Sequence, residues 1–101
     1  MFYVVFATDK ADREAARMAI RPRHREFLRN PGAHPVRVVL GGPTLAREGG
    51  EMNGTLLVIE AARIEDVQAF VHDDPYMRAD LFESLIVRPW AWGLGAPGSA
   101  A

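Results

Sequence analysis

The segment Phe2-Tyr3-Val4-Val5-Phe6-Ala7 decides how this chain is expected to fold. It is rich in β-branched and aromatic residues and is followed by Asp9-Lys10, which is typical of a strand. Successive side chains in a strand point to opposite faces of a sheet, and here both sets are apolar. The segment Thr55-Leu56-Leu57-Val58-Ile59-Glu60 also carries apolar residues on both sides. Both faces of the expected sheet therefore need a cover.

The remaining strands and helices are predicted from periodicity and from proline and glycine. Two more strands are expected at 36–40 and at 84–87, the second continuing towards residue 90. A helix at 63–72 is predicted by apolar residues at 64, 67, 70 and 71. Pro22 predicts a break, with a short helix near 11–19 and a new helix from Arg21-Pro22 to Asn30. The glycines and proline of 41–54 predict a loop there, and Pro75 predicts a short helical turn.

The order β-α-β-β-α-β is that of the ferredoxin-like split βαβ fold of the α+β class. It gives a four-stranded antiparallel sheet with helices on one face. Because the other face is also apolar, we expect a second copy to cover it in a homodimer. We expect one domain over residues 1–92 and a mobile tail over 93–101, where glycine, alanine, proline and serine offer little to pack.

Composition excludes several classes of function. The net charge of −1 provides no overall field to attract nucleic acid or an anionic membrane, and the absence of cysteine excludes disulfides and thiolate chemistry. The apolar start of the chain is too short for a membrane span and lacks a basic n-region, so we expect a cytoplasmic protein. Arginines at 13, 17, 21, 23, 25 and 29 form a basic stretch, which is either a solvated helix surface or a site for an anionic ligand.

His24 and Asp74 are the candidate catalytic residues. We place His24 in the first turn of the second helical segment, on the same face as Phe27 and Leu28, so that the helix N-terminus keeps the imidazole neutral and able to accept a proton. The alternative is a half-buried histidine that hydrogen-bonds a carbonyl. Asp74 precedes Pro75 and is either a cap or turn residue, or the carboxylate that orients an imidazole. His72 and Asp73 are near competitors for these roles.

Other candidate residues carry weaker signals. His72 is expected to face solvent, His34 is assigned no role, and the spacing of the three histidines is a weak pattern for a metal site. Trp90 and Trp92 either line a pocket or pack in a core or interface.

Several short motifs together resemble the YCII family over about residues 1–92. These are Arg21-Pro22-Arg23-His24, Gly42-Pro43, Asp73-Asp74-Pro75-Tyr76 and Val87-Arg88-Pro89-Trp90. The resemblance implies a dimeric α+β barrel and a His–Asp dyad, which maps onto His24 and Asp74. It also implies proton-transfer chemistry like that of a family dehydrochlorinase that acts on a chlorinated hydroxyquinol. The connection between Asn30 and Val36 is shorter than in many relatives, which bears on the substrate.

The resulting hypothesis is an enzyme that moves a proton on a small cyclic, aromatic substrate and needs no metal or organic cofactor. Elimination and isomerisation are the expected reaction types. We expect Tyr76, Arg21, Gly42 and Pro43 to contact the substrate. The alternatives are a non-catalytic module that binds a small ligand and, by analogy of fold alone, an oxygenase.

Overall fold

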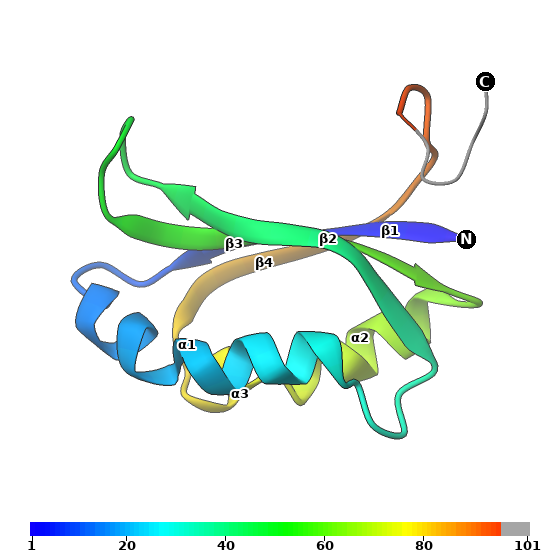
Figure 1. Ribbon diagram of the computed structural model, residues 1–101, viewed down its shortest axis with the longest axis horizontal. Coiled ribbons are helices and arrows are strands. Elements are labelled where there is room, and N and C mark those ends of the chain that lie inside the picture. The colour runs from blue at the N-terminus through cyan, green and yellow to red at the C-terminus, as the bar shows by residue number, and fades with distance from the viewer. Residues whose placement is uncertain (96–101) are drawn as a thin grey trace.

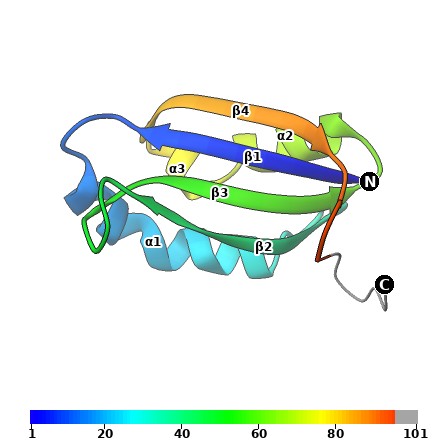
Figure 2. The same ribbon diagram turned by 90° about the horizontal axis from the view of Figure 1, so that it is seen from above.

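Four antiparallel strands form one sheet in the order β2-β3-β1-β4, and the helices lie on one of its faces (Figure 1 and Figure 2). The computed structural model describes residues 1–95. The strands are β1 (Phe2–Asp9), β2 (Val36–Leu45), β3 (Met52–Ala61) and β4 (Phe82–Trp90). The helices are α1 (Glu14–Arg29), α2 (Ile64–His72) and the short α3 (Pro75–Arg78). This arrangement confirms the predicted ferredoxin-like α+β fold. The tail expected at 93–101 lies outside the described residues from 96 onward.

The core lies between the sheet and the helices. In β1, Tyr3, Val5 and Ala7 are buried, whereas Phe6 on the opposite face is 45% exposed. This alternation follows from the pleat of the strand. The buried cluster consists of Tyr3, Val5, Leu57, Ile59, Ala61, Val67, Phe70 and Val71. Among residues 1–95, no helix is both long enough and apolar enough to cross a membrane.

α1 is one continuous helix, so the predicted break at Pro22 is wrong. A proline in a helix interior removes one hydrogen bond to the carbonyl four residues earlier, which here belongs to Met18. Both Pro22 and Met18 are exposed, so water can reach this carbonyl. The buried side of the helix therefore continues past the proline.

β2 extends to Leu45, so the predicted loop over 41–54 is also wrong, and only residues 46–51 connect β2 with β3. β2 is an edge strand with a neighbour on one side only. Proline is tolerated in such strands because it has no N–H to donate to a second neighbouring strand. A Cβ on Gly41 would lie 2.5 Å from Cδ2 of Leu57. Glycine at this position therefore reflects close packing against β3.

The short helix α3 begins immediately after α2. Asp74 is its N-cap and accepts a hydrogen bond of 2.9 Å from the backbone N–H of Tyr76, while Pro75 occupies the first turn. An aspartate cap followed by proline is a favourable helix start. α3 packs mainly against α1, so the side chains of Asp74 and Tyr76 lie beside that helix.

Candidate active site

His24 and Asp74 meet in the interior, although 50 residues separate them. Nδ1 of His24 lies 2.8 Å from Oδ1 and 3.0 Å from Oδ2 of Asp74. The two residues are only 5% and 3% exposed. Burial excludes competing water and strengthens the interaction.

His24 reaches this position from the buried side of α1. Arg17, Ile20 and His24 are the buried residues of the helix, at spacings of three and four, which place them on one face. The predicted location of His24 in a first turn is wrong, because α1 begins ten residues earlier at Glu14. The positive end of the helix dipole acts only over the first turn, so the effect expected from a helix N-terminus does not apply to this residue.

Asp74 combines the two roles that the sequence left as alternatives. Its Oδ1 accepts the backbone N–H of Tyr76 and also lies against Nδ1 of His24. The cap therefore fixes the carboxylate that faces the imidazole. An ionised carboxylate only accepts hydrogen bonds, so Nδ1 of His24 is the donor in this contact, and in the neutral imidazole the lone pair then lies on Nε2.

Tyr76 stacks on the imidazole and completes the buried arrangement. The rings of His24 and Tyr76 are 3.9 Å apart at an interplanar angle of 18°. The guanidinium carbon of Arg17 lies 4.4 Å from the centre of the Tyr76 ring. The imidazole and the guanidinium therefore both pack against the Tyr76 ring. Burial raises the pKa of Tyr76, and its hydroxyl has no hydrogen-bond partner within the described chain.

A cavity of about 140 Å³ opens between α1 and β2 beside this pair. His24 lines it, and its Nε2 makes no hydrogen bond within residues 1–95. Tyr76, Arg21, Gly42 and Pro43, the residues expected to contact a substrate, also line this cavity. The remaining lining residues are Arg17, Arg25, Leu28 and Gly41. The structure thus brings five of the six sequence-predicted site residues to one cavity, with Asp74 bound to one of them.

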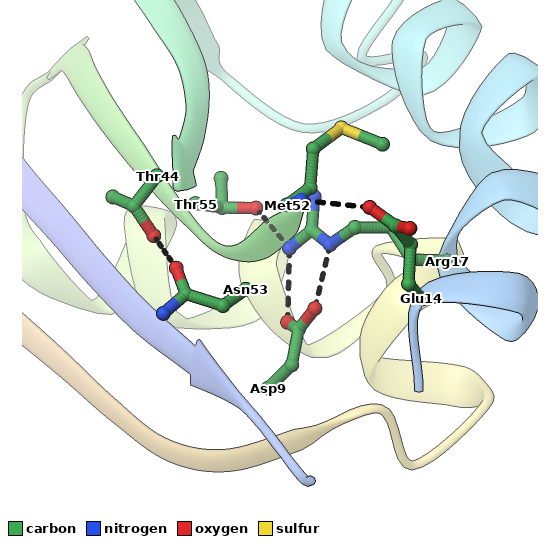
Figure 3. Close-up of polar contacts among 7 residues, drawn as sticks. All are labelled: Asp9, Glu14, Arg17, Thr44, Met52, Asn53 and Thr55. Carbon is green, nitrogen blue, oxygen red and sulfur yellow. Dashed lines mark hydrogen bonds and ion pairs between the residues drawn. The ribbon is translucent and has the colours of Figure 1, made fainter. Parts of the chain in front are cut away.

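Arg17 is a residue of the site that the sequence reasoning missed. It is 1% exposed, and its Nε and Nη2 donate to the two carboxylate oxygens of Asp9 at 2.7 and 2.9 Å (Figure 3). Its Nη2 also donates to Oγ1 of Thr55 at 2.7 Å. The spacing of positions 17, 20 and 24 was the available signal. It was obscured because Pro22 suggested that these residues belong to two helices.

A larger hollow of about 540 Å³ lies near the start of α1 and has a different character. No histidine lines it, and its charged residues are mainly carboxylates, including Asp12, Glu14 and Glu51. Glu14 accepts the backbone N–H of Met52 at 2.8 Å, and Thr44 donates to Asn53 at 2.8 Å (Figure 3). The first contact holds the hairpin of β2 and β3 against α1, and the second joins the two strands of the hairpin. We therefore place the candidate site at the smaller cavity, where a potential base is exposed to a ligand.

The other histidines lie elsewhere. His72 is exposed, as expected. His34, to which no role was assigned, places Nε2 2.8 Å from Oδ2 of Asp73, and Arg78 donates to Oδ1 of the same carboxylate at 2.7 Å. Arg78 and His34 lower the pKa of Asp73. This contact fastens the turn after α2 to the start of β2 and does not line the cavity.

Trp90 and Trp92 also lie away from the cavity. Their rings are 4.6 Å apart, and Trp92 contacts Phe2 edge to face at 6.0 Å. The two rings therefore pack against each other and against Phe2, while Trp90 remains 39% exposed. Within residues 1–95, no group of three or more potential ligands is arranged to hold a metal ion.

These features define a small ferredoxin-like α+β domain with a buried His–Asp pair at a cavity. The chain belongs to the family of the YCII-related domain, whose family model matches residues 1–91. It is 31% identical over 98 residues to Protein YciI of Escherichia coli, and the match covers 89% of this chain and 96% of that protein.

Solved structures show the same fold. 5-Chloro-2-hydroxyhydroquinone dehydrochlorinase (TftG) of Burkholderia phenoliruptrix, in complex with 2,5-dihydroxybenzoquinone, is similar with a TM-score of 0.82 and 30% identity. That similarity covers 92% of this chain and 96% of TftG. Protein Atu4242 of Agrobacterium tumefaciens is 16% identical with a TM-score of 0.57, over 96% of this chain and 98% of its own, and shows the fold alone. A small-molecule enzyme therefore shares this architecture.

Proposed function

We propose that this chain is an enzyme in which His24 removes a proton from a small, single-ring substrate. The observation that carries the proposal is the contact of Nδ1 with the buried Asp74 at 2.8 Å, which leaves Nε2 as the nitrogen available at the cavity. A general base needs a lone pair within reach of the substrate and a partner that fixes its tautomer. Asp74 supplies that partner and stabilises the imidazolium that forms.

The chemistry follows from where the proton and the electron pair go. Nε2 of His24 accepts a proton from carbon, and the electron pair of the broken C–H bond forms a new double bond. In an elimination, a leaving group on the neighbouring carbon departs with its bonding pair. In an isomerisation, the imidazolium returns the proton to a different carbon. Neither route requires an oxidant.

The size of the cavity supports a single ring. A cavity of about 150 Å³ in another protein binds benzene, and the volume here is about 140 Å³. TftG is named as a dehydrochlorinase of a chlorinated hydroxyhydroquinone and binds 2,5-dihydroxybenzoquinone. A monocyclic, oxygen-bearing substrate is consistent with both observations.

A homodimer is part of the proposal. Phe6, Leu40, Leu56 and Ile86 are exposed hydrophobic residues, and strand register places them on the face of the sheet opposite the helices. Since no described helix lies on that face (Figure 1), a second copy packed sheet to sheet is the simplest cover for these four residues.

The proposal is tested with two substrates. Purified protein is incubated with 5-chloro-2-hydroxyhydroquinone while chloride release is measured, and with 2,5-dihydroxybenzoquinone in D₂O while exchange of ring hydrogens is followed by NMR. We expect activity in at least one assay and a loss of about 10²–10⁴-fold in His24→Ala, the usual contribution of a general base. Asp74→Asn should also reduce activity, because it no longer stabilises the imidazolium.

His72→Ala provides the matched control, because His72 is an exposed histidine outside the cavity, and it should retain full activity. Activity that survives in His24→Ala would contradict the proposal. Binding of either compound by the wild type without turnover would instead favour a non-catalytic ligand-binding module.

A further inference from the structure

The charges around the cavity are all of one sign. Arg17, Arg21 and Arg25 line it, and no aspartate or glutamate does. Arg17 is neutralised by Asp9 in a buried ion pair. Within residues 1–95, neither Arg21 nor Arg25 forms an ion pair or a side-chain hydrogen bond with the protein. Two guanidinium groups at the cavity therefore lack an anionic partner.

Their position connects them with the proposed base. Arg21 and Arg25 are four residues apart on α1, which makes them neighbours on the helix surface, and His24 lies between them in sequence. Arg21 is half-buried, whereas Arg25 is exposed at the rim. The positive charges of Arg17 and Arg21 oppose the effect of burial on the pKa of Tyr76. The field of Arg21 therefore reaches the buried part of the site.

A neutral ligand would fit these charges poorly. It would displace water from two guanidinium groups without replacing all the hydrogen bonds that they lose, which is unfavourable. An ionised oxygen would instead accept short, charge-assisted hydrogen bonds from them. The other walls of the cavity, which include Leu28, Pro43 and Tyr76, are suited to a ring.

We propose that Arg21 and Arg25 bind an ionised oxygen of the substrate, so that the substrate is an acidic single-ring phenol or hydroxyquinone bound as its anion. This inference rests on the proposed function, because it specifies the substrate of the same site. Arg21 supplies the inner contact and Arg25 the contact at the rim. Of the six arginines in the basic stretch, those at 17, 21 and 25 line the cavity, and those at 13, 23 and 29 do not.

The test uses 4-nitrophenol, which ionises near neutral pH and whose anion absorbs visible light. Binding to the full-length protein is measured below and above the ionisation of the probe, with 4-nitroanisole as the uncharged analogue. We expect the bound probe to ionise at lower pH than the free probe. Arg21→Gln and Arg25→Gln should each weaken binding of the anion by about tenfold or more and leave 4-nitroanisole unaffected.

Arg23→Gln is the matched control, since it removes the same charge from an exposed residue of the same helix that does not line the cavity. It should leave both affinities unchanged. If all three variants weaken the anion equally, or if the wild type does not prefer the anion, the inference is wrong. Displacement of the probe by inorganic phosphate at similar concentration would also overturn it, because the site would then select charge and not a ring.

The failure of this inference can be separated from that of the proposed function. His24→Ala should still bind 4-nitrophenolate, since it keeps both arginines. Loss of turnover in His24→Ala, together with unchanged anion binding in Arg21→Gln and Arg25→Gln, would leave the base in place and remove only the anion subsite.

Discussion

The ion pair of Arg17 and Asp9 links a helix to the sheet beneath a candidate site. Arg17 belongs to α1 and Asp9 ends β1, and both are almost completely buried. Taking two charges out of water is costly, and it is offset only when their hydrogen bonds are satisfied. Two bonds to Asp9 and one to Thr55 meet that condition here. The same guanidinium lies over Tyr76, so the pair also supports the ring that stacks on His24.

Removal of one charge from this pair should be strongly destabilising. We expect Asp9→Asn to lower the free energy of unfolding by about 3–5 kcal/mol, because it leaves Arg17 buried without a counter-charge. Urea denaturation followed by circular dichroism measures the change. Asp80→Asn is the control, since it removes an exposed partner of Lys10, and asparagine tolerates the positive φ of 56° at this position. A small effect of Asp9→Asn, similar to that of the control, would show that the pair contributes little.

The two residues of the His–Asp pair could be singled out from the sequence, and the family resemblance paired them, whereas the Arg–Asp pair could not be predicted. His24 lies two residues after a proline and shares a predicted helix face with two apolar residues, and Asp74 precedes a proline after a helix, so each has a local signature in the sequence. Arg17 lies among six arginines, and no local pattern distinguishes the buried one from its exposed neighbours. Arg17 is recognised as buried only once α1 is known to continue through Pro22 and the contact with Asp9 in β1 is seen.

At the scale of elements, the continuity of α1 determines the site. Arg17 and His24 both pack against the Tyr76 ring and come from one helix, on either side of Pro22 in sequence. Seven helical residues span about 10 Å along the axis, or two turns, so the two side chains lie on the same side of the helix and can contact one ring. A break at Pro22 would remove this spacing. The proline is tolerated because it occupies the solvent-facing side of the helix.

Replacement of Pro22 should therefore stabilise the protein. Pro22→Ala restores an N–H donor to the carbonyl of Met18, and this gain exceeds the loss of chain stiffness in the unfolded state. We expect the free energy of unfolding to rise by about 1–2 kcal/mol in urea denaturation, with activity unchanged because Pro22 does not line the cavity. Arg23→Ala at the next exposed position should have little effect. A loss of stability in Pro22→Ala would show that the stiffness of proline outweighs the missing hydrogen bond.

The two wrong predictions, the break in α1 and the loop over 41–54, have the same physical cause. Proline and glycine report local preference, but neighbouring structure can override it. Packing of α1 on the sheet overrides the preference of Pro22, and pairing with β3 overrides that of Gly41-Gly42-Pro43. The strands rich in β-branched residues, where local and long-range preferences agree, were predicted correctly apart from their ends.

At the scale of the whole molecule, the sheet is apolar on both sides, while helices cover only one (Figure 1). Phe6 pairs with Leu56 in β3 and with Ile86 in β4, which forms a row of exposed hydrophobic side chains across three strands. Burial of such surface is favourable by about 25 cal/mol per Å² before the costs of association. The apolar residues on both faces of β1 and β3 already predicted this imbalance from the sequence.

The uncovered face should therefore control the oligomeric state. We expect the wild type to sediment as a dimer in analytical ultracentrifugation, and Phe6→Asp to sediment as a folded monomer, because a carboxylate at the centre of the row cannot be buried unpaired. Met18→Asp is the matched control, since Met18 is also an exposed apolar residue but lies on α1, away from this face, and it should remain dimeric. Circular dichroism establishes that each variant is folded. A wild type that stays monomeric as its concentration rises would contradict the sheet-to-sheet dimer, and a monomeric Met18→Asp with a dimeric Phe6→Asp would place the interface on the helical side.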